Sequence, residues 1–164
     1  MVRVLLRAVR VDLQSNTPVL LLQEDEGEGR TLPIFIGTPE ATAIAYALQG
    51  VDVPRPLTHD LLVDVVDALG ASIERVVVTD LEGSTYFAEL HLATDAGVVL
   101  VSARPSDAVA LAVRTGSALY VADHLMELES VFLPDDEDDV EEDDEVVEEF
   151  REFLDTITPE DFSG

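Results

Sequence analysis

The sequence predicts an α+β fold, in which a mixed or antiparallel β-sheet packs with about three to four helices and an acidic tail follows. Strand-like segments come first, then two helical segments, then strands and a helix again, and this segregated order favours α+β over a doubly wound sheet. Charge gives a second observation, because residues 134–164 hold 16 of the 35 acidic residues and one Arg. We therefore expect one domain at 1–133 and a separate tail at 134–164.

The first block of the chain predicts a β-hairpin and a third strand. Two segments rich in Val and Leu, 2–13 and 18–23, flank the turn residues 15–17, which is typical of a hairpin. A polar, glycine-containing loop then leads to an apolar segment at 31–36, which we expect to be a strand.

Two helices are predicted next. Thr38 is expected as the N-cap of the first helix, with Pro39 at the first helical position and Gly50 at the end. The second helix begins after Thr58 as its N-cap and ends at Gly70. Its apolar residues recur at helical spacing and predict a face that packs on the core; they are Leu61, Leu62, Val65, Val66 and Leu69.

The rest of the body predicts four further strands and two helices. In chain order they are strands at 72–80, 85–93 and 98–103, a helix from the junction at Arg104 to Gly116, a short strand at 118–121 and a short helix at 122–129.

The tail combines an acidic run with a short helix. Residues 135–145 are almost all Asp or Glu and predict a solvated segment. An amphipathic helix is predicted near 145–157, and its apolar stripe needs a partner surface on this domain, on a second subunit or on another protein. The stripe consists of Val146, Val147, Phe150, Phe153, Leu154 and Ile157.

Composition excludes several classes of function. The net charge of −26 argues against broad electrostatic attraction to nucleic acid, whose phosphates are neutralised by Lys and Arg. The absence of Cys excludes disulfides and thiolate metal sites. No signal-peptide core and no apolar stretch near the roughly 20 residues of a membrane span is visible, so we expect a soluble, cytoplasmic protein. The sequence also lacks a Walker loop, a dinucleotide fingerprint, a zinc-protease motif and a nucleophile elbow.

Three predicted helices begin at polar, proline-containing junctions, at residues 37–40, 55–60 and 104–107. A helix N-terminus has free N–H groups and a partial positive charge, so an adjacent Arg can help to bind phosphate. If the junctions converge, we expect Arg55, Arg104 and Ser106 to bind a substrate phosphate. The alternative is that these residues are ordinary caps and that both arginines pair with nearby carboxylates.

His59 is the best candidate for a general base or acid, because it lies in a first helical turn where the helix dipole favours neutral imidazole. A surface histidine without a role is the alternative. Glu40, Asp60 or Asp107 would orient His59 or hold Mg²⁺ or Mn²⁺, which take oxygen ligands. The predicted catalytic residues are thus His59, Asp60 and Glu40, and the predicted metal ligands are Asp107 and Asp80.

A second polar cluster is expected on the 72–93 hairpin. Glu89 and His91 share one strand face and lie opposite Glu74 in a simple register. Such a set serves as a proton relay or a weak metal site, or is the solvated face of the sheet.

Six short motifs occur in a fixed order between residues 2 and 125. They are Leu32-Pro33-Ile34-Phe35-Ile36-Gly37, Glu40-Ala41, Arg55-Pro56-Leu57-Thr58-His59-Asp60, Thr85-Tyr86-Phe87-Ala88, Ala103-Arg104-Pro105-Ser106-Asp107-Ala108 and Arg114-Thr115-Gly116. Together they resemble the bifunctional nuclease family, also known as a bacterial domain of unknown function (BFN domain). The resemblance implies a small α+β domain that associates into dimers or larger assemblies. It also implies a nuclease activity on RNA and DNA, which is described for plant members, but it brings no catalytic residues with it.

Two hypotheses of function follow. The first is a phosphodiesterase that acts on RNA, DNA or both, with the residues named above and a divalent metal, Mg or Mn, as a possible cofactor. The second is a non-catalytic, homo-oligomeric interaction module, whose acidic tail recruits a basic partner or blocks a nucleic-acid site.

Overall fold

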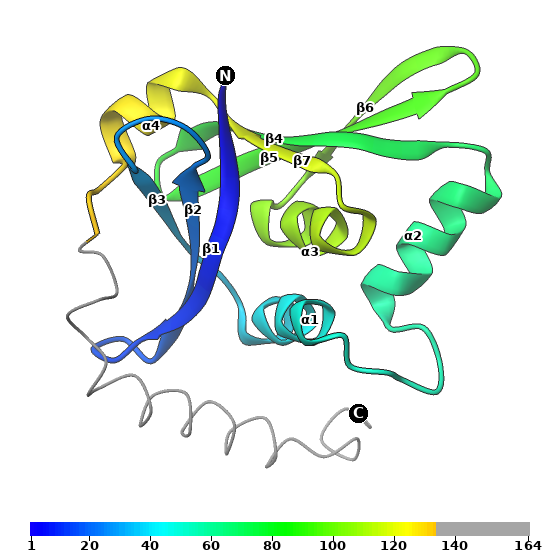
Figure 1. Cartoon of the computed structure of the whole chain (residues 1–164), viewed down its shortest axis with the longest axis horizontal. Helices are drawn as coiled ribbons and strands as arrows, with labels where there is room; N and C mark the ends of the chain where they lie inside the picture. Colours follow the sequence, from blue (N-terminus) through cyan, green and yellow to red (C-terminus); the bar gives the residue numbers. More distant parts are fainter. Residues whose placement is uncertain (134–164) are drawn as a thin grey trace. The chain divides into compact units, whose positions relative to one another are not determined.

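The computed structural model of the protein describes residues 1–133 and shows a seven-stranded mixed sheet with four helices (Figure 1). The predicted α+β fold is confirmed. The acidic run and the amphipathic helix predicted within 134–164 lie outside the described residues. In chain order, the elements are β1 (Val2–Asp12), β2 (Thr17–Glu24), β3 (Thr31–Phe35), α1 (Thr38–Gln49), α2 (Thr58–Ala68), β4 (Ser72–Glu82), β5 (Thr85–Thr94), β6 (Gly97–Ala103), α3 (Pro105–Thr115), β7 (Ala118–Val121) and α4 (Asp123–Glu129).

The sheet joins two antiparallel halves through a short central strand. Its order is β3-β2-β1-β7-β4-β5-β6, with β3 and β6 at the edges. β7 pairs antiparallel with β1, where Val2 lies opposite Val121, and parallel with β4, where Val76 lies opposite Leu119. This one parallel pair makes the sheet mixed, and the helix α3 precedes β7 as the crossover from the β6 edge.

Helix α3 is the centre of the core. Seven of its residues are buried, and three of them are the alanines Ala108, Ala110 and Ala112, whose small side chains let the helix lie close to its neighbours. α3 packs against α1, α2 and the strands β4, β5 and β7. The largest fully buried side chains around it include Leu20, Leu22, Leu32, Ile44, Leu111 and Met126.

The predicted helix caps are wrong by one residue. Gly37 and Leu57 occupy the N-cap positions of α1 and α2, and Thr38 and Thr58 are already helical. Neither cap residue uses its side chain; instead, the Asp60 carboxylate accepts a hydrogen bond from the Leu57 N–H at 2.8 Å. Asp60, inside the first turn, thus satisfies the N–H of the N-cap residue, whereas a threonine at the N-cap would accept from an N–H within the first turn.

The apolar face predicted for α2 is mostly not in the core. Leu61, Leu62 and Val65 are exposed, and Leu69 is 80% exposed, whereas Val66 packs against the core as predicted and Val63 joins it. α2 lies at the margin of the helical layer, where it contacts α3 and β4 (Figure 1). The periodicity identified an apolar stripe, but the described residues 1–133 leave most of it exposed.

The β4–β5 hairpin is longer and less regular than predicted. β4 continues to Glu82, two residues into the gap expected at 81–84, so that only Gly83 and Ser84 connect it to β5, with Gly83 at a φ of 63°. A register shift between Ile73 and Arg75 places Arg75, rather than Glu74, opposite His91. The expected cluster of three is therefore wrong; His91 retains Glu89 at 3.9 Å.

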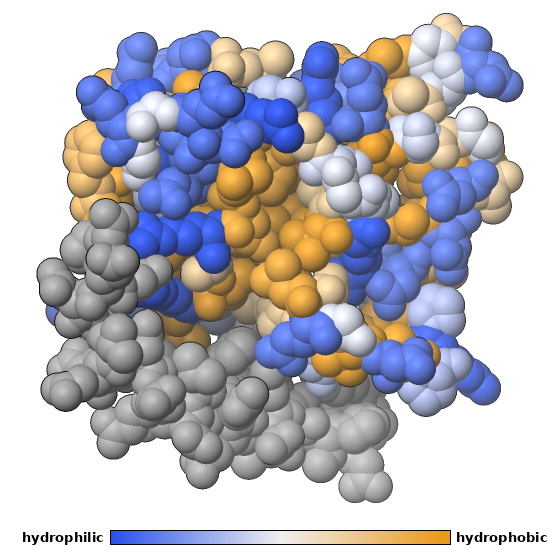
Figure 2. Space-filling model, viewed as in Figure 1, coloured by the Kyte–Doolittle hydropathy of each residue, from blue (hydrophilic) through white to orange (hydrophobic). Residues whose placement is uncertain are grey.

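Within the described part of the chain, no helix is long and apolar enough to span a lipid bilayer. Apolar residues reach the surface in several places between hydrophilic ones, as the space-filling view shows for one face (Figure 2).

Candidate functional site

The N-terminal ends of α1, α2 and α3 meet at one place, as the junction hypothesis requires. Arg104, the N-cap of α3, donates from Nη2 to Glu40 Oε1 of α1 at 2.8 Å and from Nε to Asp107 Oδ2 at 2.7 Å. Asp107 Oδ1 lies 3.0 Å from His59 Nε2 of α2. We call these four residues, Glu40, His59, Arg104 and Asp107, the junction cluster.

The junction cluster is layered from the inside outwards. The His59 side chain is 11% exposed and the Arg104 side chain 66% exposed, so the guanidinium closes the cluster towards solvent. Gly37 makes room for this arrangement, because a Cβ at that position would overlap with the Glu40 carboxylate. Glu40 can therefore bend back over the start of its own helix and reach Arg104.

Asp107 remains ionised in this setting. Burial raises the pKa of its carboxyl, but the hydrogen bonds from Arg104 and His59 lower it by more, so the pKa lies below its ordinary value. The same contacts with Asp107, and then with Glu40, raise the pKa of Arg104, which keeps its charge.

An ionised Asp107 fixes the tautomer of His59. A carboxylate can only accept, so Nε2 of the imidazole carries a proton, and in the neutral ring the lone pair is on Nδ1. Among the described residues, Nδ1 has no hydrogen-bond partner. The arrangement is a carboxylate that orients a histidine whose second nitrogen is available as a base.

The guanidinium of Arg104 is hydrogen-bonded through two of its three nitrogens, which leaves the third available to a ligand. Its bonds to the two carboxylates use Nε and Nη2, and within residues 1–133 none uses Nη1. With neutral His59, the junction cluster has a net charge of −1. The partial positive charges of the three helix N-termini, about half a unit each, are opposite in sign and together somewhat larger, about +1.5.

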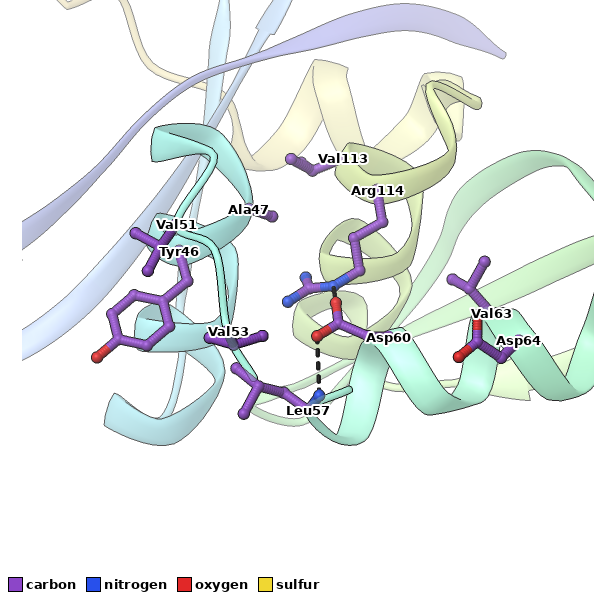
Figure 3. A pocket seen from close by; sticks show the side chains of 10 residues that line it. All are labelled: Tyr46, Ala47, Val51, Val53, Leu57, Asp60, Val63, Asp64, Val113 and Arg114. Atoms are coloured by element: carbon purple, nitrogen blue, oxygen red, sulfur yellow. Dashed lines mark hydrogen bonds and ion pairs between the residues drawn. The ribbon is translucent and has the colours of Figure 1, made fainter. Parts of the chain in front are cut away.

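Asp60 does not belong to the junction cluster. Its Oδ1 accepts from Arg114 Nε at 2.5 Å (Figure 3). Arg114 Nη2 also donates to the Ala43 carbonyl at 3.1 Å. Arg114 is almost fully buried and joins α1, α2 and α3. No role was predicted for Arg114; the signal in the sequence that marks it is its place in the last turn of the helix, directly after the apolar run 108–113.

A cleft of about 360 Å³ opens beside this ion pair. Figure 3 shows Tyr46, Val53 and Val63 around it, with Asp60 and Arg114 between the helices. None of the four residues of the junction cluster lines the cleft. The junction cluster and this cleft are therefore separate features: His59 of the first turn of α2 belongs to the cluster, and Asp60 of the same turn lines the cleft.

Two of the predicted phosphate ligands stand outside the contacts of the junction cluster. Arg55 is exposed in the loop before α2, and no ion pair to it is found in residues 1–133. Ser106 is buried in the first turn of α3, next to Asp107 in sequence, and its hydroxyl makes no hydrogen bond to the junction cluster. Arg104 is the predicted phosphate ligand that the fold brings to His59.

The two predicted metal ligands are separated. Asp107 contacts His59 and Arg104, whereas Asp80 pairs with His124 of α4 at 3.5 Å. In the part of the chain that the structure describes, no group of three or more His, Asp or Glu side chains is placed to hold a metal ion. The guanidinium of Arg104 lies between the carboxylates of Glu40 and Asp107, so these residues as arranged do not fit a divalent cation.

Comparison with known proteins agrees with the motifs at the helix starts. An uncharacterized protein of Mycobacterium tuberculosis is 45% identical over 161 residues, which cover 95% of this chain and 94% of that protein. Bifunctional nuclease 2 of Arabidopsis thaliana is 31% identical over 109 residues, and bifunctional nuclease 1 of the same plant is 30% identical over 111. These matches cover 65% and 66% of this chain but only about a third of each plant protein. The sequence profile of the bifunctional nuclease domain matches residues 20–134, a range that contains the whole junction cluster, and the chain therefore belongs to the bifunctional nuclease domain family.

Proposed function

We propose that the protein is a phosphodiesterase that cleaves RNA, DNA or both, and that the junction cluster is its active site. The observation that carries the proposal is the 3.0 Å contact between His59 and Asp107, which are 48 residues apart, directly beside a charged and exposed arginine. The two plant relatives are named as bifunctional nucleases, which supports the same reaction class.

In this mechanism, His59 Nδ1 takes a proton from the attacking water or from a ribose hydroxyl. The attacking oxygen forms a bond to phosphorus, the bond to the leaving oxygen breaks, and that oxygen takes a proton from solvent. Asp107 holds the imidazole in place and stabilises the imidazolium that forms. Arg104 Nη1 donates to a phosphate oxygen while its other nitrogens remain on Glu40 and Asp107.

This mechanism assigns more limited roles to the other predicted residues. Glu40 becomes a positioning residue for Arg104. Asp60 supports the first turn of α2 and has no part in proton transfer, because both of its oxygens are engaged by Arg114 and by the Leu57 N–H. Arg55 remains a candidate for a more distant phosphate of the chain, since it is exposed and precedes the same helix.

The test is a cleavage assay on single-stranded RNA and DNA with purified full-length chain, run with and without Mg²⁺ or Mn²⁺. His59→Ala and Arg104→Ala should each lower the rate by at least about 100-fold, the contribution expected of a general base or of a charge-stabilising donor. His124→Ala is the matched control, because it removes an exposed histidine that also pairs with an aspartate. Equal cleavage by wild type and by the double variant His59→Ala, Arg104→Ala would identify a contaminant and refute the proposal.

A second candidate, a non-catalytic interaction module, is favoured by one specific observation. The exposed stripe of α2 and the exposed strand β6 are apolar in a chain of net charge −26. A pull-down with and without residues 135–164 tests the part of this hypothesis that concerns the tail. Unchanged partners would reduce the tail to a solubilising appendage.

A further inference from the structure

The two edge strands of the sheet, β3 and β6, differ in how well they are protected against pairing with a strand of another chain. β3 contains Pro33, and its first residue forms a bridge in which the Thr31 and Val131 backbones exchange two hydrogen bonds of 2.8 Å. α4 also packs against β3. Proline, short length and coverage are the usual means by which an edge strand avoids pairing with another chain.

Within residues 1–133, β6 has none of these protections. It is seven residues long, has no charged residue and no proline, and pairs with β5 without a register shift. Its four large apolar residues, Val98 to Val101, are 39–56% exposed. An uncharged, regular and exposed edge strand presents unpaired N–H and C=O groups to any strand that can align with it.

Both faces of β6 are apolar, and one of them continues the core. Val99 lies opposite Leu92 and Val101 opposite the buried Leu90, so these two valines are on the side of the sheet that carries the core. Val98 and Leu100 are on the other side. The core layer therefore extends to β6, where the described residues leave it exposed.

The outer stripe of α2 is a second uncovered surface on the same half of the molecule. Leu61, Val65 and Leu69 follow one another at intervals of four residues and are all exposed. α2 packs against β4, two strands away from β6 in the sheet. Apolar residues also reach the surface where α2 and the β5–β6 hairpin lie in Figure 2.

We propose that β6 pairs antiparallel with β6 of a second copy of this chain, so that the two sheets become one continuous sheet. The strand suits pairing with itself, because Leu100 is central, Val99 and Val101 flank it, and small residues, Gly97 and Ala103, stand at the ends. Two chains of net charge −26 repel one another, and β6 is a surface where they can meet without bringing charged side chains together.

The symmetry of this pairing also determines where the two α2 stripes lie. The twofold axis of an antiparallel strand pair runs perpendicular to the sheet, so the helices of both copies lie on the same side. The two α2 helices, with Leu61, Val65 and Leu69 exposed, then lie on the same side of the continuous sheet as the valines of the core face. This assembly is independent of the proposed nuclease activity, since no residue of the junction cluster takes part.

The test is the molar mass of the full-length chain by light scattering. The wild type should have twice the 17.8 kDa of one chain, and Leu100→Lys should have the mass of a single chain. Leu48→Lys is the matched control and should keep the wild-type mass, because Leu48 of α1 is 55% exposed and Leu100 is 56% exposed. A wild type of 17.8 kDa, or a dimer that Leu100→Lys leaves intact, would overturn the proposal.

A covalent test covers the case in which Leu100→Lys fails to fold. The chain has no cysteine, so a single introduced thiol is the only one present. Leu100→Cys should form an intermolecular disulfide on mild oxidation, because directly opposed residues in an antiparallel pair have Cβ atoms about 4.5–5.5 Å apart. Leu48→Cys should not; similar cross-linking of both variants, or of neither, would contradict the pairing.

Discussion

Arg104 and Arg114 show how one helix uses two identical side chains for opposite purposes. Arg104 precedes α3, is mostly exposed and leaves Nη1 open, whereas Arg114 ends the same helix, is almost fully buried and has Nε, Nη1 and Nη2 all engaged. A cation that is open on one side can meet a ligand. A cation that is fully coordinated by the Asp60 carboxylate and two backbone carbonyls stabilises the fold instead.

Arg114→Met should lower the free energy of unfolding at pH 7 by about 2–3 kcal/mol. The expected cost is below the 3–5 kcal/mol of a completely buried pair because Asp60 is partly exposed. Arg3→Met is the control, since its pair with Asp25 at 3.1 Å is at the surface and should contribute less than about 1 kcal/mol. Urea unfolding followed by circular dichroism measures both; equal costs would show that Arg114 is not the link between the three helices.

The same pair sets a pH dependence with a definite sign. Burial raises the pKa of the Asp60 carboxyl, but the hydrogen bonds from Arg114 and the Leu57 N–H lower it by more. A folded-state pKa below the unfolded value of about 3.9 means that the stabilisation is complete above that pH and is lost as the pH falls through the folded pKa. The difference between wild type and Arg114→Met should therefore shrink as the urea series is repeated at lower pH.

Elements differ in how far local sequence determines them. The ends of α1 and α3 were predictable because Gly50 and Gly116 adopt φ values of 61° and 69°, which glycine accepts without strain. The junction cluster was predictable only as a set of helix starts. Its convergence depends on β7, which inserts between β1 and β4, and no local pattern specifies that strand order.

The separation of Asp60 from His59 could not be predicted for a related reason. Adjacent residues on a helix point in directions about 100° apart, so one turns to Asp107 and the other to Arg114. Likewise, the stripe of α2 has the periodicity of a core face, and only the structure shows that α3 and β4 leave most of it uncovered.

Leucine-to-alanine substitutions in α2 and α3 should separate these two kinds of apolar face. Leu111→Ala, at a fully buried position, should lower the free energy of unfolding by roughly 2–5 kcal/mol. Leu69→Ala, the same change at an exposed position, should alter it by less than about 0.5 kcal/mol. Both are measured in the Leu100→Lys background, so that association through β6 does not contribute; similar losses would mean that α2 is buried in the single chain after all.

At the scale of the whole molecule, charge opposes the proposed substrate. The formal charge is −26, and nucleic acid is a polyanion, so the long-range field repels what the junction cluster would bind. The range of that field depends on salt, with a Debye length of about 30 Å at 0.01 M and 3 Å at 1 M. A phosphodiesterase with this composition should therefore bind its substrate better as salt is added from very low concentrations, opposite to the usual behaviour of nucleic-acid-binding proteins.

Removing the charge of the tail while keeping its length isolates this effect. Replacing the ten acidic residues of 135–145 by their amides should raise the affinity for single-stranded RNA at least about tenfold at 0.01 M salt, and the gain should vanish near 1 M. Fluorescence anisotropy measures binding without relying on cleavage. Deletion of residues 134–164 is the companion variant: if it alone raises the affinity and the amide variant does not, the tail blocks the site by occupying it rather than by its charge. Equal affinities for wild type and both variants at low salt would show that the acidic tail has no influence on the substrate at all.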